Sequence, residues 1–289
     1  VLGMLIPPSL LMIIYGVLAE DSIGRMFLAG ILPGLVMAGA FAALILAMAY
    51  IWPHKIYASG APLTAEQADT ETWASAAVKF FPIMVLVALV LGGLYGGFFT
   101  PTEEGAVGAA GAFVIALVRR RLTWRKLWRV LTETGYVSVS VLFLIIAASL
   151  YSRMLALSGM PAGITTGVTQ MGLGPSGFLI AYLAIVVALG CIIDSVSIML
   201  IMLPIVLPIA TAFQMDLIWF GVLTVVAVEI GLLTPPFGVS VYTVKSALND
   251  SSISIKDIFT GTFPFVLMML LVLLVLIVFP GLSTWLARL

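Results

Sequence analysis

The sequence predicts an all-α, polytopic membrane protein with inverted repeats, two re-entrant helical hairpins and broken helices. The first observation is composition: of 289 residues, 62% are hydrophobic and 9% are charged, whereas a soluble domain carries about 25% charged residues. The second is a series of apolar stretches near the length of about 20 residues that a helix needs to cross a bilayer. The third is a Gly…Pro-Pro motif that occurs twice, because consecutive prolines interrupt a helix.

Six long apolar stretches are candidate membrane helices. They cover residues 27–51, 80–118 with an interruption, 137–157, 178–193, 196–213 and 264–279. Residues 52–72 carry prolines and carboxylates and are predicted to form a solvent loop. In chain order we expect the second limb of a first hairpin, helices interrupted at 92–105, helices broken near Asp194, a second hairpin and a C-terminal helix, covering residues 1–26, 27–136, 137–216, 217–248 and 258–280.

A basic arm follows the second apolar stretch at residues 119–129. It contains Arg119, Arg120, Arg121, Arg125, Lys126 and Arg129. Basic residues in short loops favour the cytoplasmic side of a membrane, and tryptophans such as Trp124 and Trp128 suit the headgroup boundary. A nucleic-acid surface would also be basic and aromatic, but 13 basic and 13 acidic residues leave no net charge, which excludes nucleic acid as a partner.

An internal repeat is centred on the paired prolines. Gly-Met-Leu-Ile-Pro-Pro-Ser at residues 3–9 matches Gly-Leu-Leu-Thr-Pro-Pro-Phe at residues 231–237, and each copy is followed by a Gly-x-x-Pro pattern with a phenylalanine just before it, at residues 27–33 and 259–264. Two consecutive prolines remove two N–H donors, so several carbonyl oxygens lose their helical partners. At membrane depth such a backbone is tolerated only where protein, a water-filled cavity or a bound ion satisfies those oxygens.

The second Pro-Pro element predicts a re-entrant hairpin. Residues 219–233 form a limb of 15 residues, about 22 Å of helix, which is too short to cross. We expect a tip at residues 234–238 and a return limb at 239–248. If residues 80–118 cross once, five crossings separate the two hairpins, and the hairpins enter from opposite faces, as an inverted repeat requires.

The interruption at residues 92–105 allows two interpretations. Its glycines and its polar residues Thr100, Thr102 and Glu103 could form an unwound segment that faces an ion or substrate. Alternatively it is a capped turn between two helices, with Thr102 as N-cap and the carboxylates of Glu103 and Glu104 at the positive end of the new helix. The sequence leaves both open.

A second interruption places Asp194, with Ser195 and Ser197, between two apolar stretches. A charged group at membrane depth costs roughly 3 kcal/mol or more and usually faces a cavity or a partner. Asp194 therefore either lies near an ion or substrate route or caps the following helix at an interface. An intramembrane aspartyl enzyme would need a second carboxylate beside it, and no motif pairs Asp194 with Glu229 or Glu103.

Other chemistries lack the residues they require. One histidine and one cysteine are too few ligands for a zinc site, and Cys191 is expected to be a packing residue. No Gly-x4-Gly-Lys-Ser/Thr loop occurs, which disfavours an ATP-driven pump. Hydroxyls, carboxylates and the carbonyl oxygens at the interruptions suit a hard cation such as sodium.

These motifs together resemble the large membrane subunit of TRAP (tripartite ATP-independent periplasmic) transporters, the DctM type. The likeness covers the whole chain and rests on the segment at 3–16, the Gly-Leu-Tyr-Gly-Gly-Phe-Phe-Thr-Pro-Thr-Glu run at 93–103, Asp194 and the segment at 231–238. Glu104 departs from the commoner family pattern, in which alanines follow the first glutamate. By comparison with the family, we also expect an N-terminal part before residue 1.

The resemblance implies sodium-coupled import of an organic acid across the bacterial inner membrane by an elevator mechanism. It also implies a small four-helix membrane subunit and a soluble periplasmic binding protein as partners, Na+ as coupling ion and no other cofactor. Dicarboxylate, sialic acid and keto acid remain open as substrates. A receptor-independent anion symporter of the divalent-anion/sodium type is the alternative.

Carried over by residue, the resemblance implies an ion and substrate site framed by the two Pro-Pro elements. Sodium is expected at Ser9, Thr234 and Gly238. The full set of implied site residues is Pro7, Pro8, Ser9, Thr100, Thr102, Glu103, Asp194, Ser195, Ser197, Thr234, Pro235, Pro236 and Gly238.

Overall fold

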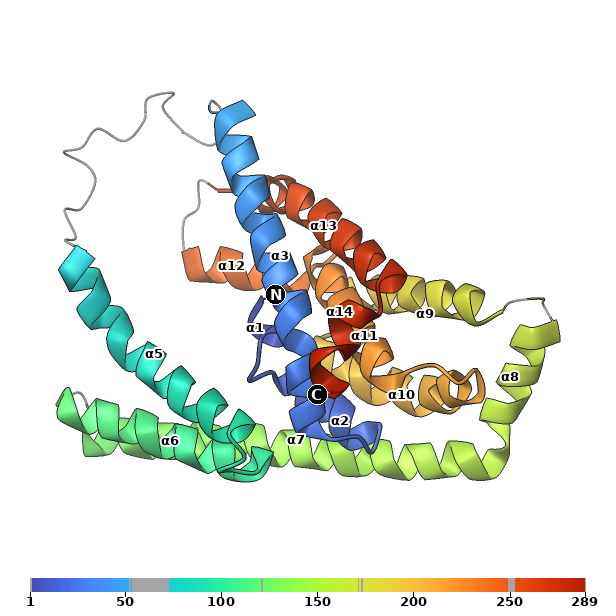
Figure 1. The fold of residues 1–289 in the computed structure, drawn as a ribbon, viewed down its shortest axis with the longest axis horizontal. Coiled ribbons are helices and arrows are strands. Elements are labelled where there is room, and N and C mark those ends of the chain that lie inside the picture. Colours follow the sequence, from blue (N-terminus) through green and yellow to red (C-terminus); the bar gives the residue numbers. More distant parts are fainter. Residues whose placement is uncertain are drawn as a thin grey trace. The chain divides into compact units, whose positions relative to one another are not determined.

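The fold was analysed in a computed structural model, which describes residues 2–51, 53, 73–120, 122–170, 172, 174–248 and 253–288. Every regular element in these ranges is a helix, and four helices there are long and apolar enough to cross a membrane. The protein is therefore an all-α, polytopic membrane protein, as predicted (Figure 1). The solvent loop expected at 52–72 lies outside the described residues apart from Pro53.

The chain divides into two compact units. Unit 1 contains residues 1–44 and 141–289, and unit 2 contains residues 45–140. Helices α3 (Ile23–Ile51) and α7 (Trp124–Ser158) run from one unit into the other. The other helices of unit 1 are α1 (Leu2–Leu5), α2 (Leu10–Leu18), α8 (Met160–Gln170), α9 (Pro175–Gly190), α10 (Ser195–Ala212), α11 (Leu217–Leu233), α12 (Val239–Leu248), α13 (Ile255–Val278), α14 (Gly281–Thr284) and the 3-10 turn Leu286–Arg288.

Helix α11 forms the core of unit 1. Almost every residue from Ile218 to Leu232 is buried, as expected of a helix that is apolar on all sides. It packs against α2, α9, α10 and α13. Tyr182 of α9 stacks on Phe220 of α11 with ring centroids 4.8 Å apart, and its hydroxyl lies 3.1 Å from Thr224 Oγ1.

Helices α11 and α12 form one interrupted helix, not the re-entrant hairpin expected at 217–248. From α11 through the break at 234–238 into α12, successive residues contact partners with lower and lower residue numbers in α13 or just before it. Three contacts define this path: Trp219 Nε1 donates to Leu276 O at 2.8 Å, a Cβ on Gly238 would meet the Phe259 ring at 2.8 Å, and Lys245 Nζ donates to Ile253 O at 2.5 Å.

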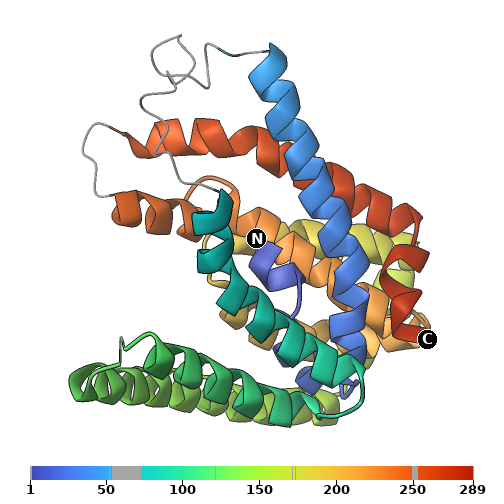
Figure 2. The ribbon, with the colours of Figure 1, turned by 60° about the vertical axis from the view of Figure 1, so that its left-hand side comes forward.

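In a hairpin the neighbours would reverse after the tip, and they do not. Figures 1 and 2 accordingly show α12 beyond the end of α11 instead of beside it. The paired prolines remove hydrogen bonds but do not themselves reverse the chain. Because α11 and α12 both pack against α13, the chain continues in the same direction.

The first Pro-Pro element has the same form, so the hairpin limb expected at 1–26 is also corrected. Helices α1 and α2, separated at residues 6–9, run antiparallel to α3: Ile6 packs on Gly34, Met12 on Gly30 and Gly16 on Ile23. The Tyr15 hydroxyl at the end of α2 donates to Leu217 O at the start of α11, at 2.6 Å, and α1 also contacts α11. The two interrupted helices therefore run in opposite directions, as an inverted repeat requires.

Unit 1 does contain a helical hairpin, formed by α9 and α10. Phe178 near the start of α9 meets Phe213 just after α10, with ring centroids 5.6 Å apart, and the chain turns at residues 191–194. At this turn Cys191 O accepts a hydrogen bond from Gly238 N at 3.2 Å. The ten residues of α12 continue about 15 Å past that level. The α9–α10 hairpin therefore ends part-way along the second interrupted helix.

Unit 2 is built on an antiparallel pair, α5 (Trp73–Tyr95) and α6 (Pro101–Val118). Arg119 Nη2 donates to Val78 O at 3.2 Å, and Gly108 and Gly111 of α6 pack against Val90 and Leu86 of α5. Residues 80–118 therefore belong to two antiparallel helices instead of one segment, and the number of times they cross the membrane stays a prediction, because neither helix is among the four candidate spans. The chain turns at residues 96–100, where Gly97 has a φ of 72°, a conformation open to glycine.

Candidate functional site

The break between α1 and α2 at residues 6–9 is called the first break, and the break between α11 and α12 at residues 234–238 the second break. The turn between α9 and α10 meets the second break, and we call residues 190–197 and 231–238 together the tip site. Helices α9 and α11 run parallel, and Gly190 and Gly231 bring their backbones into contact at the site. A Cβ on Gly190 would lie 2.7 Å from Gly231 Cα, and one on Gly231 would lie 2.6 Å from Gly190 Cα. The bond from Gly238 N to Cys191 O joins the two loops. The predicted site did not include Gly190, Cys191 or Gly231. A glycine near the end of each apolar helix was the sequence feature that could have indicated the close approach of the two helices.

The second break leaves several backbone oxygens without a helical donor, because Gly238 N, which would serve Thr234 O, goes to Cys191 O and, in the described part of the chain around the break, no bond to Leu233 O is formed. Thr234 satisfies two others, because its N–H donates to Gly231 O at 2.9 Å and its Oγ1 to Ile230 O at 2.7 Å. The helical donor for Leu232 O would be the nitrogen of Pro236, which carries no hydrogen. Within residues 174–248 no hydrogen bond ends on Leu232 O. This oxygen lies 3.4 Å from the position of a Cβ on Gly238, so it belongs to the tip site.

At the first break the equivalent oxygen, Met4 O, accepts a hydrogen bond from a residue of the break itself. Ser9 Oγ donates to Met4 O, the carbonyl that Pro8 cannot serve, and accepts from Met12 N at 3.3 Å. Ser9 is fully buried and caps α2. The aligned residue of the second copy is Phe237, which cannot make these bonds. Both Pro-Pro peptide bonds, at Pro7–Pro8 and Pro235–Pro236, are cis.

Asp194 lies at the tip site as the N-cap of α10. Its carboxylate accepts from Ser197 N at 3.0 Å and from Ser197 Oγ at 2.6 Å, and Ser195 begins the helix. The capping interpretation is therefore observed, and it places the exposed carboxylate within three residues of the Cys191–Gly238 bond. Both contacts are to Ser197, so they provide no carboxylate pair of the kind an aspartyl enzyme needs.

Thr100, Thr102 and Glu103 form a helix start in unit 2. Thr100 and Glu103 make a reciprocal capping box, with Thr100 N donating to Glu103 Oε2 at 2.8 Å and Glu103 N to Thr100 Oγ1 at 3.4 Å. The N-cap is Thr100 and not Thr102, because Pro101 at the first helical position has no N–H to be capped. These residues take no part in the contacts that build the tip site.

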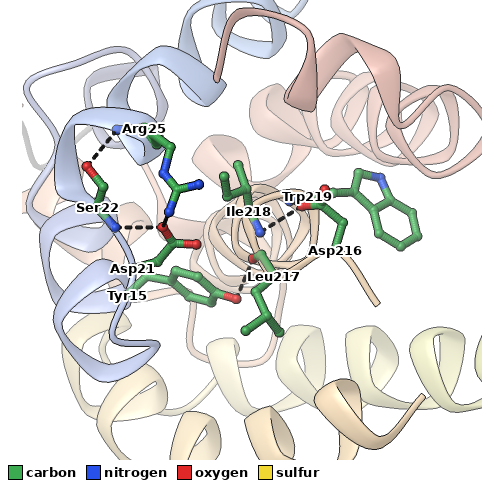
Figure 3. Close-up of polar contacts among 8 residues, drawn as sticks. All are labelled: Tyr15, Asp21, Ser22, Arg25, Asp216, Leu217, Ile218 and Trp219. Carbon is green, nitrogen blue, oxygen red and sulfur yellow. Dashed lines mark hydrogen bonds and ion pairs between the residues drawn. The ribbon is translucent and has the colours of Figure 1, made fainter. Parts of the chain in front are cut away.

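A polar cluster secures the start of α11 (Figure 3). Asp216 caps the helix by accepting from Ile218 N and Trp219 N, each at 3.0 Å, and it pairs with Arg288 at 2.6 Å. Partial burial alone would raise the pKa of the Asp216 carboxyl, but the hydrogen bonds from Trp219, Arg288 and Ile218 together lower it. Tyr15 binds the neighbouring carbonyl, that of Leu217. The cluster therefore fixes α11 at the end opposite the tip site.

The fold and the tip site define an inverted-repeat membrane protein whose interrupted helices bring unpaired backbone oxygen to a helical hairpin. This is the architecture of secondary transporters. The chain belongs to the family described as "Tripartite ATP-independent periplasmic transporter, DctM component", which matches residues 1–282.

Proteins similar to this chain are named as permease proteins of TRAP transporters. The chain is 32% identical over 98% of its length to the C4-dicarboxylate TRAP transporter large permease protein of Pseudomonas aeruginosa, covering 64% of it. It is 31% identical over 100% of its length to the sialic acid TRAP transporter permease protein of Haemophilus influenzae, covering 45% of it. It is 30% identical over 99% of its length to the ectoine large permease protein of Halomonas elongata, covering 64% of it. The chain thus spans less than two thirds of each of these relatives.

Proposed function

We propose that this chain acts within the membrane permease of a TRAP system that imports an organic acid together with sodium. Its partners in this proposal are a small four-helix membrane subunit and a periplasmic binding protein, and its site of action is the bacterial inner membrane. Family membership supports the class. The relatives are named for C4-dicarboxylates, sialic acid, ectoine and 2,3-diketo-L-gulonate, so the substrate is left open within that range.

The observation that carries the proposal is the unpaired backbone oxygen of Leu232, at the second break. Leu232 O and Thr234 Oγ1 are oxygen groups two residues apart at the end of α11, and hard cations prefer oxygen ligands. A backbone oxygen left unpaired at membrane depth costs several kcal/mol unless something satisfies it. Sodium bound at the tip site would supply that interaction. Sodium at Ser9 fits less well, because Ser9 Oγ already serves Met4 O and Met12 N.

Coupling in this proposal follows from differential binding. Sodium at the second break holds residues 234–238 against the α9–α10 turn, and this arrangement presents the polar groups of the tip site to the substrate anion. The pair of ligands therefore favours one conformation over others. Unit 1 contains both breaks, so it is the part that would carry the substrate in an elevator movement.

Uptake by the reconstituted system tests the coupling. The full-length permease, its small subunit and its binding protein are placed in proteoliposomes, and accumulation of labelled substrate is measured with and without an inward sodium gradient. We expect accumulation only with the gradient. Uptake that ignores sodium would refute the coupling, and uptake that needs no binding protein would favour the receptor-independent symporter.

Substitution of Thr234 tests the site. Thr234→Val removes the hydroxyl oxygen, and Thr234→Ser is the matched control that keeps it. Loss of a ligand to a charged species is worth roughly 1.5 kcal/mol or more, so half-activation by sodium should shift about tenfold upward in the valine variant. The serine variant should respond like the parent. Equal sodium activation in all three proteins would rule out Thr234 as a ligand.

A further inference from the structure

The basic arm plays no part in the tip site or in the proposed transport step. It contains six of the chain's 13 basic residues within residues 119–129. Arg119 is the member tied to unit 2, through its bond to Val78 O. The remainder continues into the first turns of α7, which begins at Trp124.

These first turns form a sharply amphipathic helix. Trp124, Trp128 and Leu131 have the spacing i, i+4, i+7, so they share one face, and their side chains are 77%, 65% and 56% exposed. Arg125 and Arg129, spaced i, i+4, share the neighbouring face, and both are exposed. An exposed apolar face beside a basic one is the pattern of a helix that lies at a membrane surface.

The two arginines are available to an anion. Among the described residues no ion pair or hydrogen bond engages the guanidinium of Arg125 or Arg129. Residues four apart on a helix lie about 5–6 Å from each other, so two guanidinium groups can approach one phosphate, which suits their fork of donors. A surface groove lined by Trp124, Arg125 and Trp128 adjoins them, with room for the apolar part of a lipid next to its charged head.

We propose that the first turns of α7 bind an anionic phospholipid, with Arg125 and Arg129 on its phosphate and Trp124 and Trp128 against its glycerol and upper acyl chain. Charge complementarity selects an anionic lipid over a zwitterionic one. The exposed tryptophan and leucine face places the occupant in a bilayer and not in water. The inference is independent of sodium coupling and of the tip site.

Fluorescence quenching by lipid tests the proposal. The full-length permease is reconstituted in phosphatidylcholine nanodiscs that contain either brominated phosphatidylglycerol or brominated phosphatidylcholine. The arm's signal is the part of the tryptophan fluorescence lost in a Trp124→Phe/Trp128→Phe variant. We expect brominated phosphatidylglycerol to quench that signal more strongly, and this preference to decline as salt is raised.

Two charge-removing variants separate a site from general attraction. Arg125→Gln/Arg129→Gln should weaken the relative association of phosphatidylglycerol about thirtyfold, from the usual contribution of basic residues near an anionic surface. Arg153→Gln/Lys256→Gln, which removes two exposed charges elsewhere, should leave it unchanged. Absence of a phosphatidylglycerol preference in the parent, or an equal loss in both variants, would overturn the proposal. If Arg125→Gln/Arg129→Gln fails to fold, the salt titration of the parent tests the proposal, and a phosphatidylglycerol preference that does not decline with salt would overturn it.

Discussion

Replacing Gly231 by alanine should open the tip site. The added Cβ would lie 2.6 Å from both Gly190 Cα and Val187 O, where ordinary contacts begin at 3.4 Å. Both obstacles are backbone atoms, so neither can rotate away, and the two helices must separate by about 0.8 Å. Overpacking of this kind costs about 1–3 kcal/mol, and alanine recovers about 1 kcal/mol of helix propensity. Taking the upper value for a backbone obstacle leaves a net loss of about 2 kcal/mol.

The single cysteine of the chain reports on this change, because Cys191 follows Gly190 and is only 6% exposed. A loss of about 2 kcal/mol corresponds to a roughly thirtyfold larger open population. A maleimide should therefore label Cys191 about thirtyfold faster in Gly231→Ala than in the parent. Gly261→Ala is the matched control, since a Cβ there meets nothing within 4 Å, and it should label like the parent. Equal labelling of the two variants would refute the close packing of α9 against α11.

Two further predictions concern helix starts. Asp216 has a pKa below its usual value. The stability that it adds is therefore present above its unfolded pKa, near 3.9, and is lost as the pH falls from there through the folded pKa. Asp216→Asn should remove this part of the acid sensitivity, measured as the melting temperature between about pH 2 and 5. Thr100→Ala should destabilise the start of α6 by about 1 kcal/mol through loss of the capping box, whereas Thr102→Ala should change it by less than about 0.5 kcal/mol, and hydrogen exchange of the first turn distinguishes the two.

The sequence predicted the places where helices stop more reliably than the direction taken afterwards. The breaks at Pro7–Pro8 and Pro235–Pro236 and the interruption before Ser195 all occur in the structure. These follow from local chemistry, because a proline lacks an N–H wherever it lies. A re-entrant hairpin was nevertheless expected at 217–248, where the structure has an interrupted helix, and the hairpin is formed at 175–212 instead. The sequence does not give the direction after a break, since that depends on distant packing partners.

The candidate site was predicted in the same uneven way. Thr234, Gly238 and Asp194 were expected at one site, and the structure brings their loops together through Gly238 N and Cys191 O. Thr100 and Glu103 had an equally suggestive composition but form a capping box. A threonine and a glutamate near a proline are compatible with either role, and only their hydrogen-bond partners distinguish the two.

Composition and covalent chemistry alone determined that this chain is an all-α membrane protein, that its helices are interrupted at paired prolines, and that a repeat relates the two interruptions. The difference between Met4 O and Leu232 O also lies in the sequence: both lose the same local donor, and Ser9 replaces it in one copy whereas Phe237 cannot in the other. Only the tertiary structure decided which segments reverse and where Leu232 O lies. Its position is set by the packing of α11 and α12 along α13, because this packing brings together residues that are far apart in the chain.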